Sequence, residues 1–233
     1  MKTHMEHSRF TDKDIRDIFS DLQKRWATVD EQGYPAVYQS FSPKSVAVID
    51  SLPYLQNRRV LDIGCNSGVY SCLAAFFSES VIGTDTNPKL IERANLTDEY
   101  FRDKFSDMKR VEFTADPFDQ IISSGRVDSL IMTLVLYHIG DRNVRKLGDL
   151  IAEHIESVVI QVRPGRRNAF AKNPNWKSPT TTQVYNGLFS IEDTFDFLRD
   201  YGFSNATVTH LDALFASEKN SDPEYFPMIL ATK

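Results

Sequence analysis

The sequence predicts an α/β fold built on an open, mostly parallel sheet, and three stretches of the chain indicate it. Residues 58–68 combine a short β-prone apolar run with a glycine-containing turn, and the apolar residues 69–77 that follow suit a buried helix. Residues 80–84 form a second short strand, which ends at Asp85. Residues 127–136 are an almost continuous apolar run, which is typical of a central strand buried on both faces.

The N-terminal part of the chain predicts a helix at residues 11–29, because its apolar side chains recur at helical spacing. Thr11 and Asp14 form a capping signal at its start. Mixed charge at both ends favours packing against the main sheet over contact with a membrane or a partner helix. Residues 32–43 carry aromatic residues and prolines, which indicates an ordered connector. The apolar stripe of the helix consists of Ile15, Ile18, Phe19, Leu22 and Trp26.

The remaining elements follow from apolar runs that are bounded by turn residues. Ser190 and Asp193 form a capping signal for one helix, and Gly202 is placed to end that helix. The expected helices span residues 45–52, 141–154 and 190–201, with another that begins at Pro88, and the further strands span residues 108–115, 157–162, 203–210 and 226–232.

The turn after the first strand, residues 64–68, carries the most specific pattern in the chain. Gly64 and Gly68 are its flexible positions, and Asn66 between them is the non-glycine type that best tolerates a positive φ. A strand, a glycine-rich turn and a helix leave backbone N–H groups free at the carboxyl end of the strand. Ligands bind there in open α/β sheets. The turn lacks the Gly-x-Gly-x-x-Gly spacing of a nicotinamide site.

Residues 60–68, Val-Leu-Asp-Ile-Gly-Cys-Asn-Ser-Gly, resemble motif I of the class I S-adenosylmethionine (SAM)-dependent methyltransferases. The usual motif is Asp/Glu-x-Gly-x-Gly-x-Gly, and Asn66 stands here in place of the middle glycine. The resemblance implies a three-layer α/β/α sandwich with a seven-stranded, mostly parallel sheet of strand order 3-2-1-4-5-7-6. It also implies SAM as the cofactor, with residues 1–52 as a helical extension or lid and residues 53–233 as the SAM-binding methyltransferase domain.

The resemblance assigns three acids at strand ends to different parts of SAM. Asp62 is expected near the amino-acid end, through backbone and water, Asp85 on the ribose, and Asp116 on the adenine amino group. A carboxylate that accepts two hydroxyl hydrogen bonds also suits a ribose on physical grounds. The alternatives are a helix N-cap for Asp85, although Asn87 is better placed before Pro88, and a simple Asp-Pro turn for Asp116. The expected cofactor-binding residues are Asp62, Gly64, Cys65, Asn66, Gly68, Asp85, Thr86, Asp116, Pro117, Phe118 and Leu134.

The segment Leu136-Tyr137-His138 resembles the loop after the fourth strand in many SAM methyltransferases, which faces the transferred methyl group. His138 is the candidate general base, because the unperturbed pKa of histidine lies near neutrality. Tyr137 is the second candidate catalytic residue, as a wall that faces the substrate. The alternatives are a structural histidine and a packed tyrosine ring.

The segment 163–188 carries five basic residues between Arg163 and Lys177 and no acid over the same stretch. Guanidinium groups bind carboxylates and phosphates bidentately, so Arg163, Arg166 and Arg167 are the candidate residues for binding an anionic acceptor. The alternative is a solvated basic loop. Tyr38, in the connector, is a further candidate for lining the substrate site, and core packing is the alternative for its ring.

Composition limits the classes of partner. Lys and Arg number 27 against 32 Asp and Glu, a net charge of -5, which gives no overall attraction to nucleic acid. The two cysteines, Cys65 and Cys72, fit buried thiols rather than a disulfide framework, and no Cys/His metal spacing is present. The N-terminus lacks a signal-peptide core, and no apolar run is long enough to cross a bilayer. We therefore expect a cytoplasmic protein without a metal, and its oligomeric state stays open.

The function expected from these observations is SAM-dependent methyl transfer to a hydroxyl, carboxylate or phosphate oxygen, or to a nitrogen, of an anionic small-molecule or glycan acceptor. The same motifs are compatible with two alternative functions. One is a methyltransferase that modifies RNA or transfer RNA, and the other is a non-catalytic SAM-binding partner subunit. The turn spacing and the Tyr-His loop disfavour an aminopropyl transferase or a nicotinamide enzyme.

Overall fold

The structure is a computed structural model that describes residues 9–30, 43–136, 139, 141–162, 191–209, 214–217, 220–225 and 227–233. The chain divides into two compact units, residues 1–118 and residues 119–233.

The main sheet confirms the predicted α/β class and strand order. Its strands are β1 (Arg59–Ile63), β2 (Ser80–Thr84), β3 (Val111–Thr114), β4 (Ser129–Thr133), β5 (Ser157–Gln161), β6 (Asn205–Thr209) and β9 (Met228–Thr232). Their order is β3-β2-β1-β4-β5-β9-β6, in which β9 is the seventh strand of the sheet along the chain. The pairs β1–β2, β2–β3 and β4–β5 are parallel, and β9 runs antiparallel to both β5 and β6.

The first unit places a helix after each of its first two strands. Its helices are α1 (Asp12–Asp30), α2 (Pro43–Ser51), the short 3-10 helix η1 (Leu52–Leu55), α3 (Val69–Ala74) and α4 (Pro88–Lys104). Every residue of α3 is buried, as its apolar sequence predicts. The parallel pairing brings the carboxyl ends of β1, β2 and β3 to one edge of the sheet, where the turn after β1 lies.

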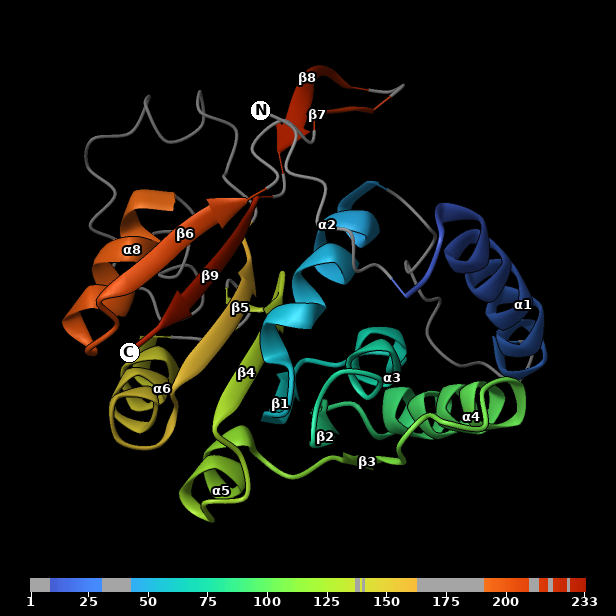
Figure 1. The fold of residues 1–233 in the computed structure, drawn as a ribbon, viewed down its shortest axis with the longest axis horizontal. Coiled ribbons are helices and arrows are strands. Elements are labelled where there is room, and N and C mark those ends of the chain that lie inside the picture. Colours follow the sequence, from blue (N-terminus) through green and yellow to red (C-terminus); the bar gives the residue numbers. More distant parts are fainter. Residues whose placement is uncertain are drawn as a thin grey trace. The chain divides into compact units, whose positions relative to one another are not determined.

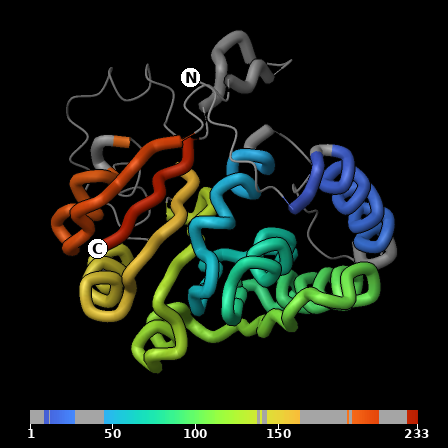
Figure 2. The backbone as a smooth tube through the Cα atoms, viewed as in Figure 1, coloured from blue at the N-terminus to red at the C-terminus, as the bar shows by residue number. Residues whose placement is uncertain are grey.

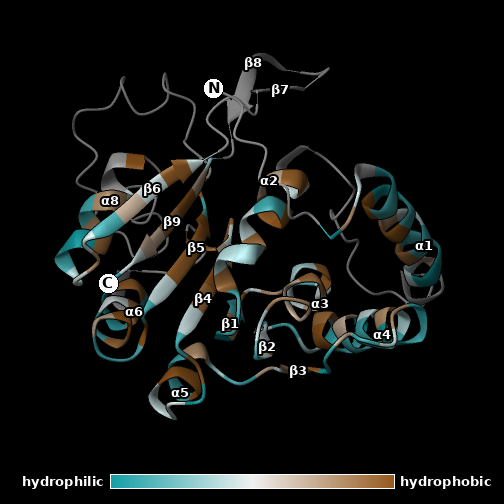
Figure 3. Cartoon of the chain, viewed as in Figure 1, coloured by the Kyte–Doolittle hydropathy of each residue, from teal (hydrophilic) through white to brown (hydrophobic). Residues whose placement is uncertain are grey.

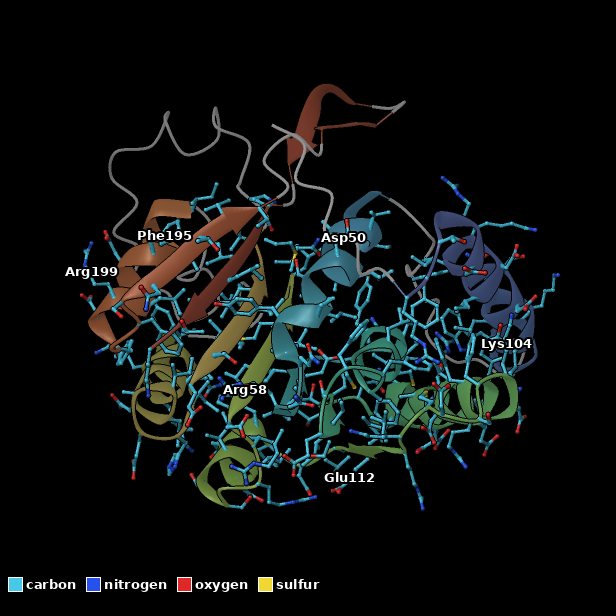
Figure 4. The ribbon with its side chains drawn as sticks, in the orientation of Figure 1. Asp50, Arg58, Lys104, Glu112, Phe195 and Arg199 are labelled. Carbon is cyan, nitrogen blue, oxygen red and sulfur yellow. The ribbon has the colours of Figure 1, made fainter. Side chains whose placement is uncertain are left out.

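The amphipathic helix α1 packs on α4, and Figures 1 and 2 show the two helices side by side. Its predicted apolar stripe is buried, and the indole N–H of Trp26 donates to Thr97 Oγ1 at 3.3 Å. Asp21 accepts from the Lys104 ammonium at 3.1 Å, where α4 ends beside α1 (Figure 4). We expected this helix to pack on the sheet; its partner is instead α4, which in turn packs against β3.

Several local sequence signals of the first unit are confirmed. Thr11 and Asp14 cap α1 reciprocally, since the Asp14 N–H donates to Thr11 Oγ1 at 3.2 Å and the Thr11 N–H donates to Asp14 Oδ2 at 2.9 Å. Asn87 is the N-cap of α4, and its side chain accepts from the Lys89 N–H at 3.0 Å.

The second unit contains α5 (Phe118–Ser123) except for its first residue, α6 (Asp141–His154) and α8 (Ile191–Asp200). All residues of β5 are buried, and Figure 3 shows this strand as hydrophobic along most of its length. Gly202 ends α8 with a φ of 91°, and the Phe203 N–H reaches back to the Leu198 carbonyl at 3.0 Å, which confirms the predicted C-cap. Strands β7 (Leu214–Ser217) and β8 (Asn220–Tyr225) form a separate antiparallel pair that the sequence did not predict.

The predicted strand at residues 127–136 proved too long. The strand β4 covers only Ser129–Thr133, because Leu134 adopts a φ of 54°, which no extended strand can contain. The apolar run continues past this bend. Among the described residues, no helix is long and apolar enough to cross a membrane.

Candidate functional site

The turn after β1 has the backbone conformation that its residues predict. Gly64, Asn66 and Gly68 all have positive φ angles, of 72°, 53° and 76°. The N–H groups of Gly64 and Cys65 both donate to the carbonyl of Thr84, at 2.8 and 3.0 Å. These two bonds tie the turn to the end of β2, so the ends of the first two strands are held together.

A phenylalanine from β3 packs directly under this turn. A Cβ atom on Gly68 would lie 2.5 Å from Cζ of Phe113, and one on Gly83 would lie 2.5 Å from Cε1 of the same ring. Both positions therefore need glycine for space, and Gly68 needs it for its φ as well. No local sequence pattern marks Gly83 or Phe113 as part of the site, because their contact joins two separate strands.

Asp62, the motif I acid, is buried with a relative exposure of 1%. Its Oδ2 accepts from the Ser71 hydroxyl of α3 at 2.6 Å, whereas its Oδ1 has no hydrogen-bond partner among the described residues. Burial raises the pKa of Asp62 to about 7; the hydrogen bond from Ser71 opposes this rise and the nearby charge of Asp85 adds to it. The site therefore holds an acid that changes charge near neutral pH.

Asp85 lies against the same turn. Its Oδ2 accepts from the backbone N–H of Asn66 at 3.1 Å, and its Oδ1 accepts from the backbone N–H of Asn87 at 2.9 Å. Because each carboxylate oxygen has a second lone pair, Asp85 can still accept hydrogen bonds from a ligand. Its carboxylate does not cap α4, since Asn87 has that role.

Asn66 adds a second unsatisfied acceptor. Its side-chain Oδ1 is buried and has no hydrogen-bond partner among the described residues. A buried acceptor without a donor is costly, so this oxygen is a candidate to accept a hydrogen bond from a bound ligand.

The third predicted acid is positioned through its backbone. The carbonyl of Asp116 accepts from Thr84 Oγ1 at 2.6 Å, and its N–H donates to Thr114 Oγ1 at 3.1 Å. The side chains of Asp116 and Pro117 are exposed, and that of Phe118 is partly buried. Thr86, which directly follows Asp85 in the sequence, is also exposed.

The remaining predicted site residues lie in the second unit or outside the described residues. Leu134 follows β4 in the second unit, where its N–H donates to the Gln161 carbonyl at 3.1 Å. The predicted catalytic and substrate-binding residues lie outside the described residues; they are Tyr137, His138, Arg163, Arg166, Arg167 and Tyr38. The described residues contain no group of three or more His, Cys, Asp or Glu side chains that could hold a metal ion.

The site in the first unit is thus rich in acceptors. It offers two unsatisfied buried oxygens, on Asp62 and Asn66, and the carboxylate of Asp85. This arrangement suits a ligand that brings donors, such as an ammonium group and hydroxyl groups.

Comparison with known proteins agrees with this arrangement. A family model described as a methyltransferase domain matches residues 61–151. Two curated relatives are ubiquinone biosynthesis O-methyltransferases. That of Paracidovorax citrulli is 35% identical over 78 residues, which cover 34% of this chain and 32% of the relative. That of Bordetella avium is 29% identical over 130 residues, which cover 54% of this chain and 51% of the relative. The matched part therefore spans about half of these relatives or less.

Among solved structures, the fold is similar to that of magnesium protoporphyrin IX methyltransferase (ChlM) from Synechocystis PCC 6803 with bound SAH. The TM-score is 0.58 at 18% sequence identity, and the match covers 96% of this chain and 100% of the other. At 18% sequence identity, this similarity is evidence for a shared fold alone.

Proposed function

We propose that this chain, which belongs to the class I SAM-dependent methyltransferase superfamily, transfers a methyl group from SAM to an oxygen atom of a small-molecule acceptor. The observation that carries the proposal is the pair of unsatisfied buried acceptors, Asp62 Oδ1 in β1 and Asn66 Oδ1 in the turn after it, within the matched domain. The relatives named as O-methyltransferases support oxygen as the acceptor atom.

The residues of the first unit fit the donors that SAM carries. Asp62 and Asn66 each offer a buried oxygen without a donor, which suits the ammonium group at the amino-acid end of the cofactor. Asp85 has lone pairs left for the ribose hydroxyls, and its bonds to the backbone of Asn66 and Asn87 hold its orientation. When bound, SAM supplies a methyl group already activated by its sulfonium, so the protein mainly has to bind and align the reactants.

Binding and labelling experiments test this proposal. Isothermal titration with SAM and with S-adenosylhomocysteine (SAH) is expected to show binding of both. Radiolabelled SAM offered with phenols, carboxylic acids, glycans and transfer RNA is expected to label a small molecule at oxygen. Absence of binding at millimolar SAM would overturn the proposal, and label confined to RNA or glycan would replace its acceptor class.

Replacing Asp85 with alanine is expected to weaken SAH binding by about 1–3 kcal/mol, because ribose hydroxyls and the two backbone N–H groups lose their acceptor. Titration calorimetry measures the change. Asp103→Ala, which removes an exposed acid from α4, is the matched control. Unchanged affinity in Asp85→Ala would remove this residue from the site.

His138 is proposed as the general base for a hydroxyl acceptor, on sequence grounds. His138→Ala is expected to lower kcat by roughly 10²-fold or more, since the hydroxyl proton must leave during transfer. Single-turnover kinetics measure this step, while SAH affinity should stay unchanged. A loss of only about twofold would argue for a structural histidine, or for a carboxylate acceptor, which needs no base.

A further inference from the structure

Ser71 is a buried residue of α3 whose hydroxyl makes one clear contact in the site. It donates to Asp62 Oδ2 at 2.6 Å and so links α3 to β1 across the turn. The other oxygen of the same carboxylate has no partner among the described residues. The Ser71 bond therefore determines which oxygen of Asp62 is left for a ligand.

We propose that Ser71 is a positioning residue: its hydroxyl orients Asp62 and favours the carboxylate form that accepts from the ammonium group of the cofactor, and cofactor binding releases the proton that buried Asp62 otherwise carries. This inference rests on the proposed function. In the coupled step, protonated Asp62 gives its proton to the buffer, and the resulting carboxylate accepts from the ammonium group of the ligand.

The surroundings of Asp62 explain why Ser71 has this influence. Burial raises the pKa of Asp62, and Asp85 raises it further, whereas Ser71 is the contact that lowers it. The titratable groups of α3 and the turn stay neutral at pH 7, because burial raises the pKa of Tyr70 to about 12 and raises those of Cys65 and Cys72 as well. Among the described residues, the hydroxyl of Ser71 lowers the pKa of Asp62 and the carboxylate of Asp85 raises it, and no cation contributes.

The coupling predicts a pH dependence of ligand affinity. With a pKa of about 7, Asp62 must lose a proton on binding below neutrality and loses none well above it. Affinity should therefore rise with pH up to about 7 and then level off, until the ammonium group of the ligand itself loses its proton at alkaline pH. Without Ser71 the pKa of Asp62 rises further, so the same curve should move to higher pH.

Titration calorimetry with SAH tests this, since SAH carries the ammonium group and undergoes no transfer. The wild-type chain, Ser71→Ala and Ser78→Ala are compared from pH 6 to 9, in buffers of different ionisation enthalpy that reveal proton release. Ser78 is the matched control, because it is also a buried serine and its hydroxyl has no hydrogen-bond partner among the described residues. Ser71→Ala is expected to bind SAH more weakly below and at neutral pH. A rise of one pKa unit would weaken binding about fivefold at pH 7, where Asp62 of the wild type is already half protonated, and would leave it close to wild type near pH 9.

A second measurement needs no ligand. Carbon-13 NMR of the Asp62 carboxyl group in the ligand-free chain should show a midpoint near 7, and a higher one in Ser71→Ala. A loss of affinity equal at every pH, or a Ser71→Ala variant identical to Ser78→Ala, would overturn the inference. If the wild-type chain itself fails to bind SAH, the proposed function fails instead; if it binds SAH without proton release at pH 6, only this inference fails.

Discussion

Replacing Gly68 with alanine is expected to destabilise the first unit by roughly 2–5 kcal/mol, one of the two largest effects that the structure predicts. Two penalties add. The φ of 76° is unfavourable for any residue with a Cβ atom, and that atom would lie 2.5 Å from Cζ of Phe113. Denaturant unfolding measures the loss, and SAH titration should show weaker binding because the turn can no longer keep its shape.

Gly83 provides a control for the contact with Phe113, although a Cβ atom on Gly68 would also lie 2.9 Å from Ala94 Cβ and one on Gly83 would lie 3.0 Å from Ser71 Oγ. A Cβ atom there would meet the same ring at 2.5 Å, but Gly83 has no positive φ. Phe113→Leu should therefore largely rescue Gly83→Ala and only partly rescue Gly68→Ala in a double-mutant cycle. Full rescue of Gly68→Ala would show that the backbone of the turn is not strained by a side chain.

Replacing Asp62 with asparagine is expected to weaken SAH binding while stabilising the folded chain at neutral and alkaline pH. The native pKa of about 7 exceeds the ordinary value of 3.8, so the folded chain binds this proton more tightly than the unfolded chain does. Protonation of Asp62 therefore stabilises the folded chain. This stabilisation is complete below about pH 4 and is lost as the pH rises to about 7. The gap between 3.8 and about 7 corresponds to roughly 4 kcal/mol at 1.36 kcal/mol per pKa unit.

An asparagine at position 62 carries no charge at any pH, so the variant does not lose folding stability between pH 4 and pH 7 in this way. The difference in melting temperature between Asp62→Asn and wild type should grow from pH 4 to pH 7 and stay constant above it. Thermal unfolding across this range measures it, with Asp103→Asn as the control for removing an exposed acid. Parallel curves for the variant and the wild type would show that Asp62 titrates normally. The expected gain in stability with loss of binding would mark Asp62 as an acid kept for its ligand.

Local patterns identified the parts of the site that depend on neighbours in the chain. The positive φ of Asn66 and the N-cap of Asn87 were both predictable, because each follows from the residue type and its immediate context. The same holds for the strand-turn-helix unit at residues 58–77 and for the acids at the ends of the strands. Leu134 was expected near the cofactor, but its backbone bend after β4 was not predicted.

Other features were beyond the reach of local patterns. The pair β7 and β8 has no alternation of apolar and polar residues, and α5 is too short for a helical period to show. The early end of β4 depends on one φ angle inside a continuous apolar run, which hydrophobicity alone does not mark.

By itself, the sequence determined the α/β class, the backbone conformation of the turn and the acids at the strand ends, because these depend on short-range periodicity, glycine and asparagine conformation, and capping. Only the tertiary structure decided that Phe113 packs under Gly68 and Gly83 and that Ser71 bonds to Asp62. Both arrangements join segments that are brought together by the packing of separate elements. The raised pKa of Asp62 also depends on tertiary structure, because the pKa of an acid depends on the side chains that exclude water from it.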